Sequence, residues 1–346
     1  MNNFIYENRT KVYFGQGCVK EFLACLVRDA GNIMLAYGQG SVKRNGIYDE
    51  VLNILMKEGK HVTEFPGIMP NPTYQKVMEG ARLAREEKTE MILGVIVTTA
   101  GTGSECNGAA VITNEEQKVK TGHDYPKCNP AFALMDPAYT FSVPGGQMVS
   151  GAFDSLSHMM EAYFSEPDEQ NVSDEISEAL MRSVIKNIRQ AVRDPKDYTV
   201  RSNLLWSSAM SENRLIKQGK RCDFACHLME HQLSAYTGCS HSQGMSVLQP
   251  VYYRHIYRDG LDKFARFARN VWMIHEEGRN REEPAEAGVH ALADLIRETG
   301  LPSRLRDIGI KDRGQLKEIA DSCHYSPGAY RKLEAEEILE IFRECF

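Results

Sequence analysis

Short apolar segments alternate with turn residues through the first part of the chain. Residues 32–37 and 61–65 have the composition of buried strands. Apolar residues at helical spacing follow each of these segments, in 47–55 and in 77–84. Alternation of strands and helices is typical of a parallel sheet with helices on its faces. We therefore predict a parallel, Rossmann-like α/β domain in this part of the chain.

The second part of the chain has a different pattern. Apolar residues recur at helical intervals, as in 176–191, and this pattern continues to a last helix around 338–342. Sixteen of the 27 glycines precede Gln147, so the turn-rich pattern ends there. The sequence therefore predicts an α/β domain over residues 1–146 and an all-helical domain over residues 147–346.

Two helical segments of the second part carry potential metal ligands at a spacing of one turn. Asp154 and His158 are four residues apart, as are His227 and His231, so each pair shares one face of its helix. His241 follows after a short break. If the two helices face each other, one carboxylate and three imidazoles can converge on one point. Such a ligand set suits Fe²⁺ or Zn²⁺ better than Mg²⁺ or Ca²⁺.

The ordinary alternative is that each pair is a surface pair or a hydrogen bond in the core, which is the commoner role of such a spacing. Both pairs, however, have apolar neighbours, namely Met159, Met160, Leu228, Met229 and Leu233. Helices with these residues are expected to be buried, and a buried imidazole or carboxylate needs a partner or a metal. We therefore favour the metal-site interpretation.

Composition and charge exclude several classes of protein. A chain of 346 residues is long enough for two domains. Its net charge of −6 argues against a nucleic-acid or anionic-membrane partner. No apolar run reaches the length of a membrane span, and Met1 to Phe4 do not begin a secretion signal, so we expect a cytoplasmic location. Nine cysteines without a framework spacing indicate reduced thiols.

A glycine-rich turn follows the first buried strand. Gly38, Gln39, Gly40 and Ser41 lie where backbone N–H groups at a helix start can hold a phosphate. The alternative is a tight strand-to-helix turn that needs glycine for its geometry alone. Because Lys43 and Arg44 are close by and no acidic residue ends the strand, the sequence leans toward the 2′-phosphate of NADP(H).

A second polar loop runs from Thr98 to Glu105. Its hydroxyls and glycine backbone could contact the phosphates or the nicotinamide amide of a cofactor. The alternative is a turn rich in serine and threonine that caps the next element.

These motifs, taken together, resemble those of the iron-containing (group III) alcohol dehydrogenases, in particular the butanol dehydrogenase type. The resemblance extends nearly end to end, and its two most specific blocks include the histidines of the predicted metal site. The stretches that carry it are residues 38–49, 70–72, 98–105, 135–137, 154–158, 227–235 and 240–244.

The resemblance implies a dehydroquinate synthase-like architecture, with an N-terminal dinucleotide-binding domain, a C-terminal helical domain and a homodimer. It implies that the metal ligands are Asp154, His158, His227 and His241. It places His231 beside the nicotinamide, as a proton relay or orienting group. The implied contacts to NAD(H) or NADP(H) are Gly38, Gln39, Gly40, Ser41, Asn71, Thr98, Thr102 and Lys120.

The chain departs from the family pattern at one place. Members of the family carry a second glycine loop, Gly-Gly-Gly-Ser, before the helix that takes the cofactor pyrophosphate. Here residues 91–95 run directly into 96–99, so about one βα unit, roughly 40 residues, is missing. We expect one strand to be lost from the sheet. Without that helix start, cofactor affinity should fall by orders of magnitude, whereas metal binding should be intact.

Three hypotheses of function follow. The first is a metal-dependent NAD(P)H oxidoreductase that interconverts primary alcohols and aldehydes. The second is a metal-binding dimeric protein that has lost cofactor binding. The third is a zinc-dependent glycerol or polyol dehydrogenase of related fold.

Overall fold

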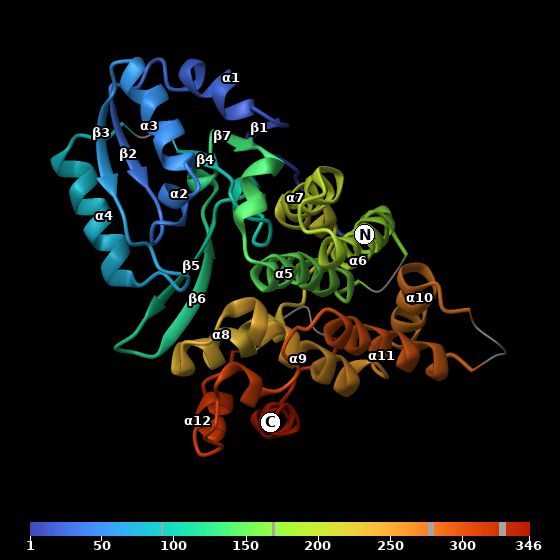
Figure 1. Ribbon diagram of the computed structural model, residues 1–346. Helices are drawn as coiled ribbons and strands as arrows, with labels where there is room; N and C mark the ends of the chain where they lie inside the picture. Colours follow the sequence, from blue (N-terminus) through green and yellow to red (C-terminus); the bar gives the residue numbers. More distant parts are fainter. Residues whose placement is uncertain (91–92, 168–169, 276–279, 325–329) are drawn as a thin grey trace. The chain divides into compact units, whose positions relative to one another are not determined.

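The computed structural model describes residues 1–90, 93–167, 170–275, 280–324 and 330–346. The chain forms two compact units. The first unit comprises residues 1–7, 100–103 and 144–346, and the second comprises residues 8–99 and 104–143. Figure 1 shows their elements along the chain.

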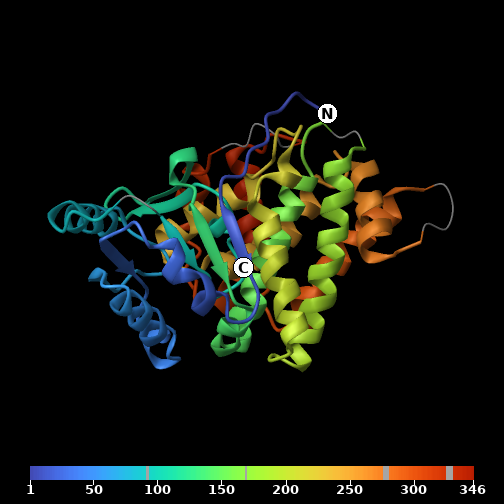
Figure 2. The ribbon, with the colours of Figure 1, turned by 90° about the horizontal axis from the view of Figure 1, so that it is seen from above.

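The unit of residues 8–99 and 104–143, called the α/β unit below, contains the predicted parallel strands. Its strands are β1 (Lys11–Phe14), β2 (Asn32–Ala36), β3 (His61–Phe65), β4 (Gly94–Ile96), β5 (Ala109–Asn114), β6 (Val119–Asp124) and β7 (Phe132–Met135). Its helices are α1 (Cys18–Leu26), α2 (Ser41–Arg44), α3 (Ile47–Lys57) and α4 (Tyr74–Glu86). The helices α1 and α3 cover one face of the parallel strands, and α4 lies on the other (Figure 1, Figure 2).

Side-chain alternation along β3 explains this layering. Val62 packs against the cluster built by α1 and α3, whose fully buried members include Val19 and Leu134. Phe65, three residues later, faces the opposite side. Its ring lies so close to Gly80 of α4 that a Cβ there would come within 2.9 Å of it. The apolar residues predicted for strands and helices therefore form the core of this unit.

The parallel strands form two separate ladders. In one, β7 lies between β1 and β4, and in the other, β2 pairs with β3. Within the described residues, β4 pairs only with β7 and β2 only with β3. Of the apolar run from 93 to 99, only Gly94–Ile96 forms a strand. The loss of one strand from the sheet stays a prediction.

The unit of residues 1–7, 100–103 and 144–346 is helical, as predicted for the second part of the chain, and is called the helical unit below. Its helices are α5 (Gly145–Tyr163), α6 (Val172–Arg193), α7 (Tyr198–Glu212), α8 (Ala225–Thr237), α9 (His241–Ile256), α10 (Leu261–Trp272), α11 (Glu282–Glu298), α12 (Leu316–Asp321) and α13 (Ala335–Glu344). The helix α5 is almost entirely buried, which explains why its sequence has no polar face.

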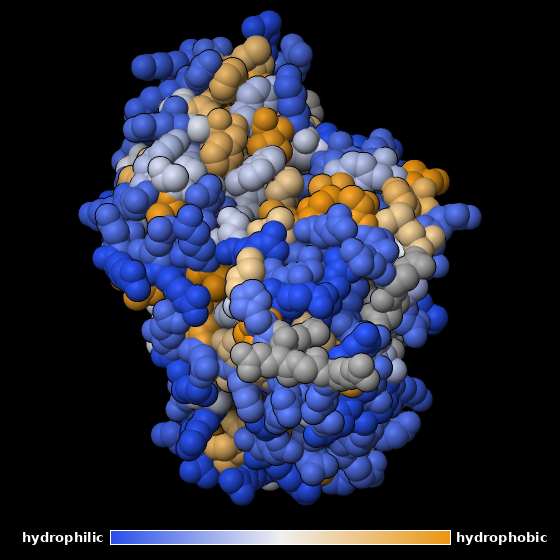
Figure 3. Space-filling model, turned by 90° about the vertical axis from the view of Figure 1, so that its right-hand side faces the viewer, coloured by the Kyte–Doolittle hydropathy of each residue, from blue (hydrophilic) through white to orange (hydrophobic). Residues whose placement is uncertain are grey.

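The face seen in Figure 3 is mostly hydrophilic, with hydrophobic residues in separate patches. No helix among the described residues has the length and apolar composition needed to cross a membrane.

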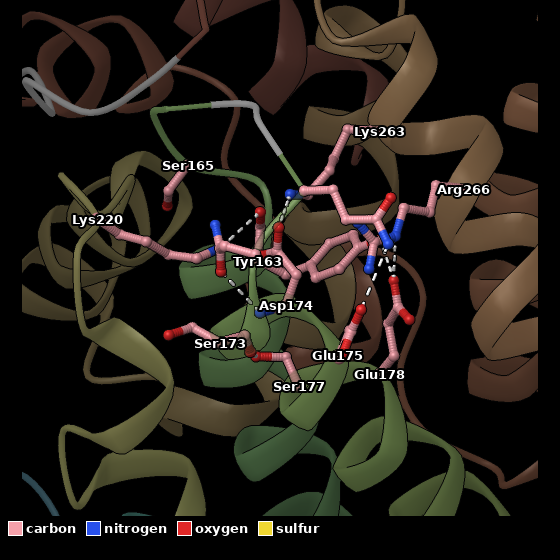
Figure 4. Close-up of polar contacts among 12 residues, drawn as sticks. Tyr163, Ser165, Ser173, Asp174, Glu175, Ser177, Glu178, Lys220, Lys263 and Arg266 are labelled. Carbon is pink, nitrogen blue, oxygen red and sulfur yellow. Dashed lines mark hydrogen bonds and ion pairs between the residues drawn. The ribbon is translucent and has the colours of Figure 1, made fainter. Parts of the chain in front are cut away.

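A buried ionic network stabilises the helical unit (Figure 4). The fully buried Asp174 of α6 forms ion pairs with Lys220 and Lys263. One turn later, Glu178 accepts hydrogen bonds from Arg266 at 2.6 Å and from the Tyr163 hydroxyl at 2.8 Å. Burial lowers the pKa of Lys220, against the opposing effect of Asp174. Lys220 therefore depends on this carboxylate to remain charged.

Asp174→Asn is expected to destabilise the protein strongly. It leaves two buried ammonium groups without their carboxylate, and removal of one partner of a buried pair costs about 3–5 kcal/mol. Urea denaturation followed by circular dichroism measures the effect. The matched control is Asp294→Asn, which breaks an exposed i,i+3 pair with Arg297 and should change stability by less than about 1 kcal/mol. Equal effects of the two substitutions would contradict the proposed role of Asp174.

Candidate metal centre

The four predicted metal ligands converge on one point within the helical unit. Asp154 and His158 lie one turn apart on α5, His227 lies in the first turn of α8, and His241 is the first residue of α9. One ligand atom from each of the four lies within 4.8 Å of the others. Asp154 Oδ1 is 3.4 Å from His241 Nε2, and the rings of His158 and His227 stack with centroids 4.6 Å apart.

Glycines at the ends of α8 and α9 allow this convergence. Gly238 ends α8 with a positive φ of 68°, a conformation that glycine adopts without strain. The chain then reverses and α9 begins at His241, beside α8. At Gly244 a Cβ would lie 2.8 Å from Cγ of Glu230, so only glycine lets the two helices approach this closely.

Two buried glutamates orient the imidazoles. Glu161 bonds to His227 Nδ1 and accepts a hydrogen bond from the Cys226 backbone N–H at 2.8 Å. Glu230 bonds to His241 Nδ1. A carboxylate on Nδ1 fixes the tautomer and ring direction so that Nε2 is the ligand atom. His227 Nε2 and His241 Nε2 are therefore set for a metal by carboxylate–histidine pairs.

The residues fit a divalent cation. His158 Nδ1 is buried and has no hydrogen-bond partner among the described residues, although a buried polar atom normally has one. A cation at the centre would satisfy this nitrogen and offset the charge of the buried Asp154. One carboxylate and three imidazoles suit Fe²⁺ or Zn²⁺, as the sequence indicates.

Sequence reasoning missed Glu161 and Glu230. The spacing contained no direct signal, because each glutamate follows one histidine by three residues but bonds to another. Glu161 follows His158 and bonds to His227, and Glu230 follows His227 and bonds to His241. A glutamate near a histidine on a helix is common, and only burial shows which of them is an orienting group. Glu161 is 1% exposed and Glu230 is fully buried.

His231 lies beside the four ligands. It occupies α8 one turn after His227, and its ring centroid is 5.6 Å from that of His241. Ligand atoms of Glu230, His231 and His241 also lie within 4.8 Å of one another. Its position outside the first coordination shell therefore stays a prediction.

Glu230→Gln is expected to weaken metal affinity about 10- to 100-fold, because the His241 ring loses its orienting carboxylate. Competition with a chromophoric chelator measures the affinity. Glu298→Gln, at a half-exposed pair with Arg189, is the matched control and should leave it unchanged. The same loss in both variants would show that Glu230 has no orienting role.

The structure brings several predicted cofactor residues to one edge of the α/β unit. Gly38 accepts a hydrogen bond from Gly67 N–H at 3.1 Å, so the turns after β2 and β3 adjoin. Asn71 lies in the loop after β3. Pro72 follows Asn71, and its carbonyl accepts a hydrogen bond from the Thr113 N–H at 2.9 Å. Thr113 is in turn the cross-strand partner of Lys120. The roles of Gly38, Asn71 and Lys120 as cofactor contacts remain predictions.

The helix that follows the glycine turn is short. Gly40 precedes α2 with a φ of 103°, as a tight turn requires, but α2 ends at Arg44. Gly46, with a φ of 79°, separates α2 from α3. A helix of one turn contributes little macrodipole, so Gly40 and Ser41 supply mainly N–H groups to any phosphate.

An acidic residue that sequence reasoning missed lies near this turn. Glu64 of β3 accepts hydrogen bonds from the Tyr37 hydroxyl and, at 3.1 Å, from Lys43 Nζ. The hydroxyls of Tyr37 and Tyr48, together with Lys43, lower the pKa of Glu64 to about 2. Glu64 is therefore ionised and offsets the charge of Lys43. The charge-based argument for a 2′-phosphate is correspondingly weaker.

The loop from Thr98 to Glu105 is divided between the two units. Thr98 belongs to the α/β unit, whereas residues 100–103, including Thr102, belong to the helical unit. The backbone of Gly101 is held there, because its N–H donates to Ser208 Oγ at 2.7 Å and its carbonyl accepts from Ser155 Oγ at 3.0 Å. The assignments of Thr98 and Thr102 to cofactor binding stay predictions.

Comparison with known proteins identifies the family. Residues 9–95 and 93–137 match the sequence model of the iron-containing alcohol dehydrogenases, and residues 148–346 match that of the C-terminal part of the Fe-containing alcohol dehydrogenase family. The chain belongs to the iron-containing alcohol dehydrogenase family. The resemblance seen in the sequence is thereby confirmed, and so is the predicted combination of an α/β and a helical part.

Three relatives illustrate the similarity of this iron-containing alcohol dehydrogenase to known members. NADH-dependent butanol dehydrogenase A of Clostridium acetobutylicum is 33% identical, with both chains covered completely. The NADPH-dependent aldehyde reductase YqhD of Escherichia coli is 29% identical over 90% of each chain. The crystal structure of NADH-dependent butanol dehydrogenase A from Thermotoga maritima superposes with a TM-score of 0.93 at 31% identity, covering 100% of this chain and 99% of that one.

The comparisons also agree with a missing segment. The alignment with the Clostridium enzyme extends over 390 positions, although this chain has 346 residues. The two stretches that match the N-terminal family model meet at residues 93–95, where the sequence predicts the deletion.

Proposed function

We propose that this protein interconverts primary alcohols and aldehydes with a nicotinamide cofactor, at a metal held by Asp154, His158, His227 and His241. The convergence of these four side chains, two of them oriented by buried glutamates, is the observation that carries the proposal. Membership of the family and the names of the relatives support an alcohol or aldehyde as substrate. They favour this hypothesis over a cofactor-free remnant or a polyol dehydrogenase.

Each protein group has a defined role in this proposal. A divalent cation held by the four ligands would supply a Lewis acid for the substrate oxygen, and a bound nicotinamide would supply the hydride donor or acceptor. Glu161 and Glu230 hold the His227 and His241 rings in place through their Nδ1 atoms. Asp154 is buried, and a carboxylate in a buried position interacts more strongly with a cation than an exposed one does. His231 takes or returns the substrate proton at an imidazole nitrogen.

The test is an assay of protein purified without oxygen and loaded separately with Fe²⁺ and Zn²⁺. We expect reduction of butanal with NADH or NADPH and little oxidation of glycerol. Faster turnover of glycerol than of butanol would favour the polyol hypothesis. Full metal loading without turnover of any of these substrates would contradict the proposed activity.

His231→Gln is expected to lower kcat about 10²- to 10⁴-fold, the usual contribution of a general acid–base group. The amide of glutamine keeps a polar group but cannot accept a proton at neutral pH. Metal content, measured by atomic emission, should stay at the wild-type level. His290→Gln, at an exposed position of α11, is the control. Loss of metal together with kcat would instead place His231 among the ligands.

The oligomeric state and location belong to the same proposal. We infer a homodimer, the state that the resemblance implies. We also infer a cytoplasmic location, because all nine cysteines are free thiols, as is usual in a reducing compartment. Light scattering of the purified protein tests the dimer.

A further inference from the structure

A cavity lies between the two parallel ladders of the α/β unit. Its volume is about 150 Å³, and it is lined by β2 and β4 together with residues of α1, α3 and the start of β7. These strands have no ladder between them in the described part of the chain. The cavity therefore lies where the two ladders are not joined.

The lining of this cavity is mainly apolar. Leu23, Ile33, Leu55, Ile96 and Phe132 contribute side chains from five different elements. Leu23 and Leu55 are nearly fully buried. Leu93 in the lining is 51% exposed, so the cavity opens to solvent at this side. An apolar cavity of about this volume, lined by leucine, isoleucine and phenylalanine, has room for a single ring such as benzene. A peptide strand of several residues does not fit into the volume available.

One end of the cavity is polar. Asn32 and Glu90 line this end but are engaged, since the Asn32 side chain donates to the Lys88 carbonyl at 3.3 Å and Glu90 accepts from the Gly31 N–H at 2.9 Å. Thr89 Oγ1 is buried and has no hydrogen-bond partner among the described residues. A buried hydroxyl in that state normally bonds to a ligand or water.

We propose that this cavity binds a small apolar molecule, about the size of one aromatic ring, that carries a single hydroxyl group. The apolar body occupies the space between β2 and β4, and the hydroxyl bonds to Thr89 Oγ1. The site is built entirely from residues of the α/β unit and is separate from the metal ligands, all of which belong to the helical unit.

Titration of the full-length, metal-loaded protein tests the proposal. Its leucine, valine and isoleucine methyl groups are labelled with ¹³C, and the probes are benzene and phenol. We expect saturable shifts at methyl groups of Leu23, Ile33 and Ile96 with both probes. Phenol should bind about threefold to tenfold more tightly than benzene, because it gains one hydrogen bond. The absence of saturable shifts at these methyl groups would overturn the proposal.

Two variants separate the apolar and polar parts of the site. Thr89→Val keeps the shape but removes the hydroxyl, so phenol should lose its advantage while benzene affinity is unchanged. Leu26→Phe places a larger side chain in the lining and should lower the affinity for benzene and for phenol at least tenfold. The control Val77→Phe, on the exposed side of α4, should have no effect.

Some outcomes of these variants contradict the proposal. A phenol preference that survives in Thr89→Val would overturn the role of the hydroxyl. Unchanged binding in Leu26→Phe would overturn the location. If Leu26→Phe fails to fold, the Thr89→Val comparison still decides, because it involves a nearly isosteric change.

Discussion

His227→Ala is expected to lower metal affinity steeply, and with it the oxidoreductase activity. The substitution removes one of four ligands and also leaves the carboxylate of Glu161 buried without its imidazole partner. The remaining three ligands hold a cation more weakly, and without it the substrate oxygen would lose several kcal/mol of charge stabilisation. We therefore expect a fall in kcat/KM of a thousandfold or more, since each 1.36 kcal/mol corresponds to a factor of ten.

Metal content and activity are measured on the same preparation. Atomic emission gives the metal per chain after purification without oxygen, and butanal reduction gives kcat/KM. The matched control is His290→Ala, at an exposed histidine of α11, which should retain both. Circular dichroism checks that the helices remain. A His227→Ala protein that keeps one metal per chain would contradict the proposed set of four ligands.

Cofactor binding is expected to be weak in this chain and to recover when the missing βα unit is restored. A pyrophosphate is normally held by N–H groups at a helix start, and each charge-assisted hydrogen bond is worth about 1.5–3 kcal/mol. Loss of two such bonds corresponds to about 10²- to 10⁴-fold in affinity. The separation of β2 from β4 is the structural trace of this loss.

The experiment inserts the corresponding segment of the Clostridium acetobutylicum relative between Val95 and Ile96. Fluorescence titration with NADH and NADPH should show affinity rising by about 10²- to 10⁴-fold. A glycine–serine insert of equal length is the control and should give no gain. Native affinity equal to that of the relative would contradict the expectation. If the native chain gives no saturable fluorescence change with NADH or NADPH, the result would favour the second hypothesis, a metal-binding protein without cofactor binding, over the enzyme.

The sequence by itself determined the elements and the candidates for the metal site. Strands and helices were predictable because their apolar periodicities differ, and the helical second part follows from its 3.6-residue repeat. Asp154 with His158 and His227 with His231 were recognisable as candidates because residues four apart share a helix face. The missing unit was also visible, because the glycine loop expected after one strand is absent from the sequence.

Only the tertiary structure decided which groups complete these sites. Glu161 and Glu230 became orienting groups because α5, α8 and α9 bury them against imidazoles, and no local pattern encodes that burial. Glu64 pairs with Lys43 because β3 lies beside β2. The cavity between β2 and β4 likewise depends on which strands pair, since pairing is a long-range property of the whole sheet.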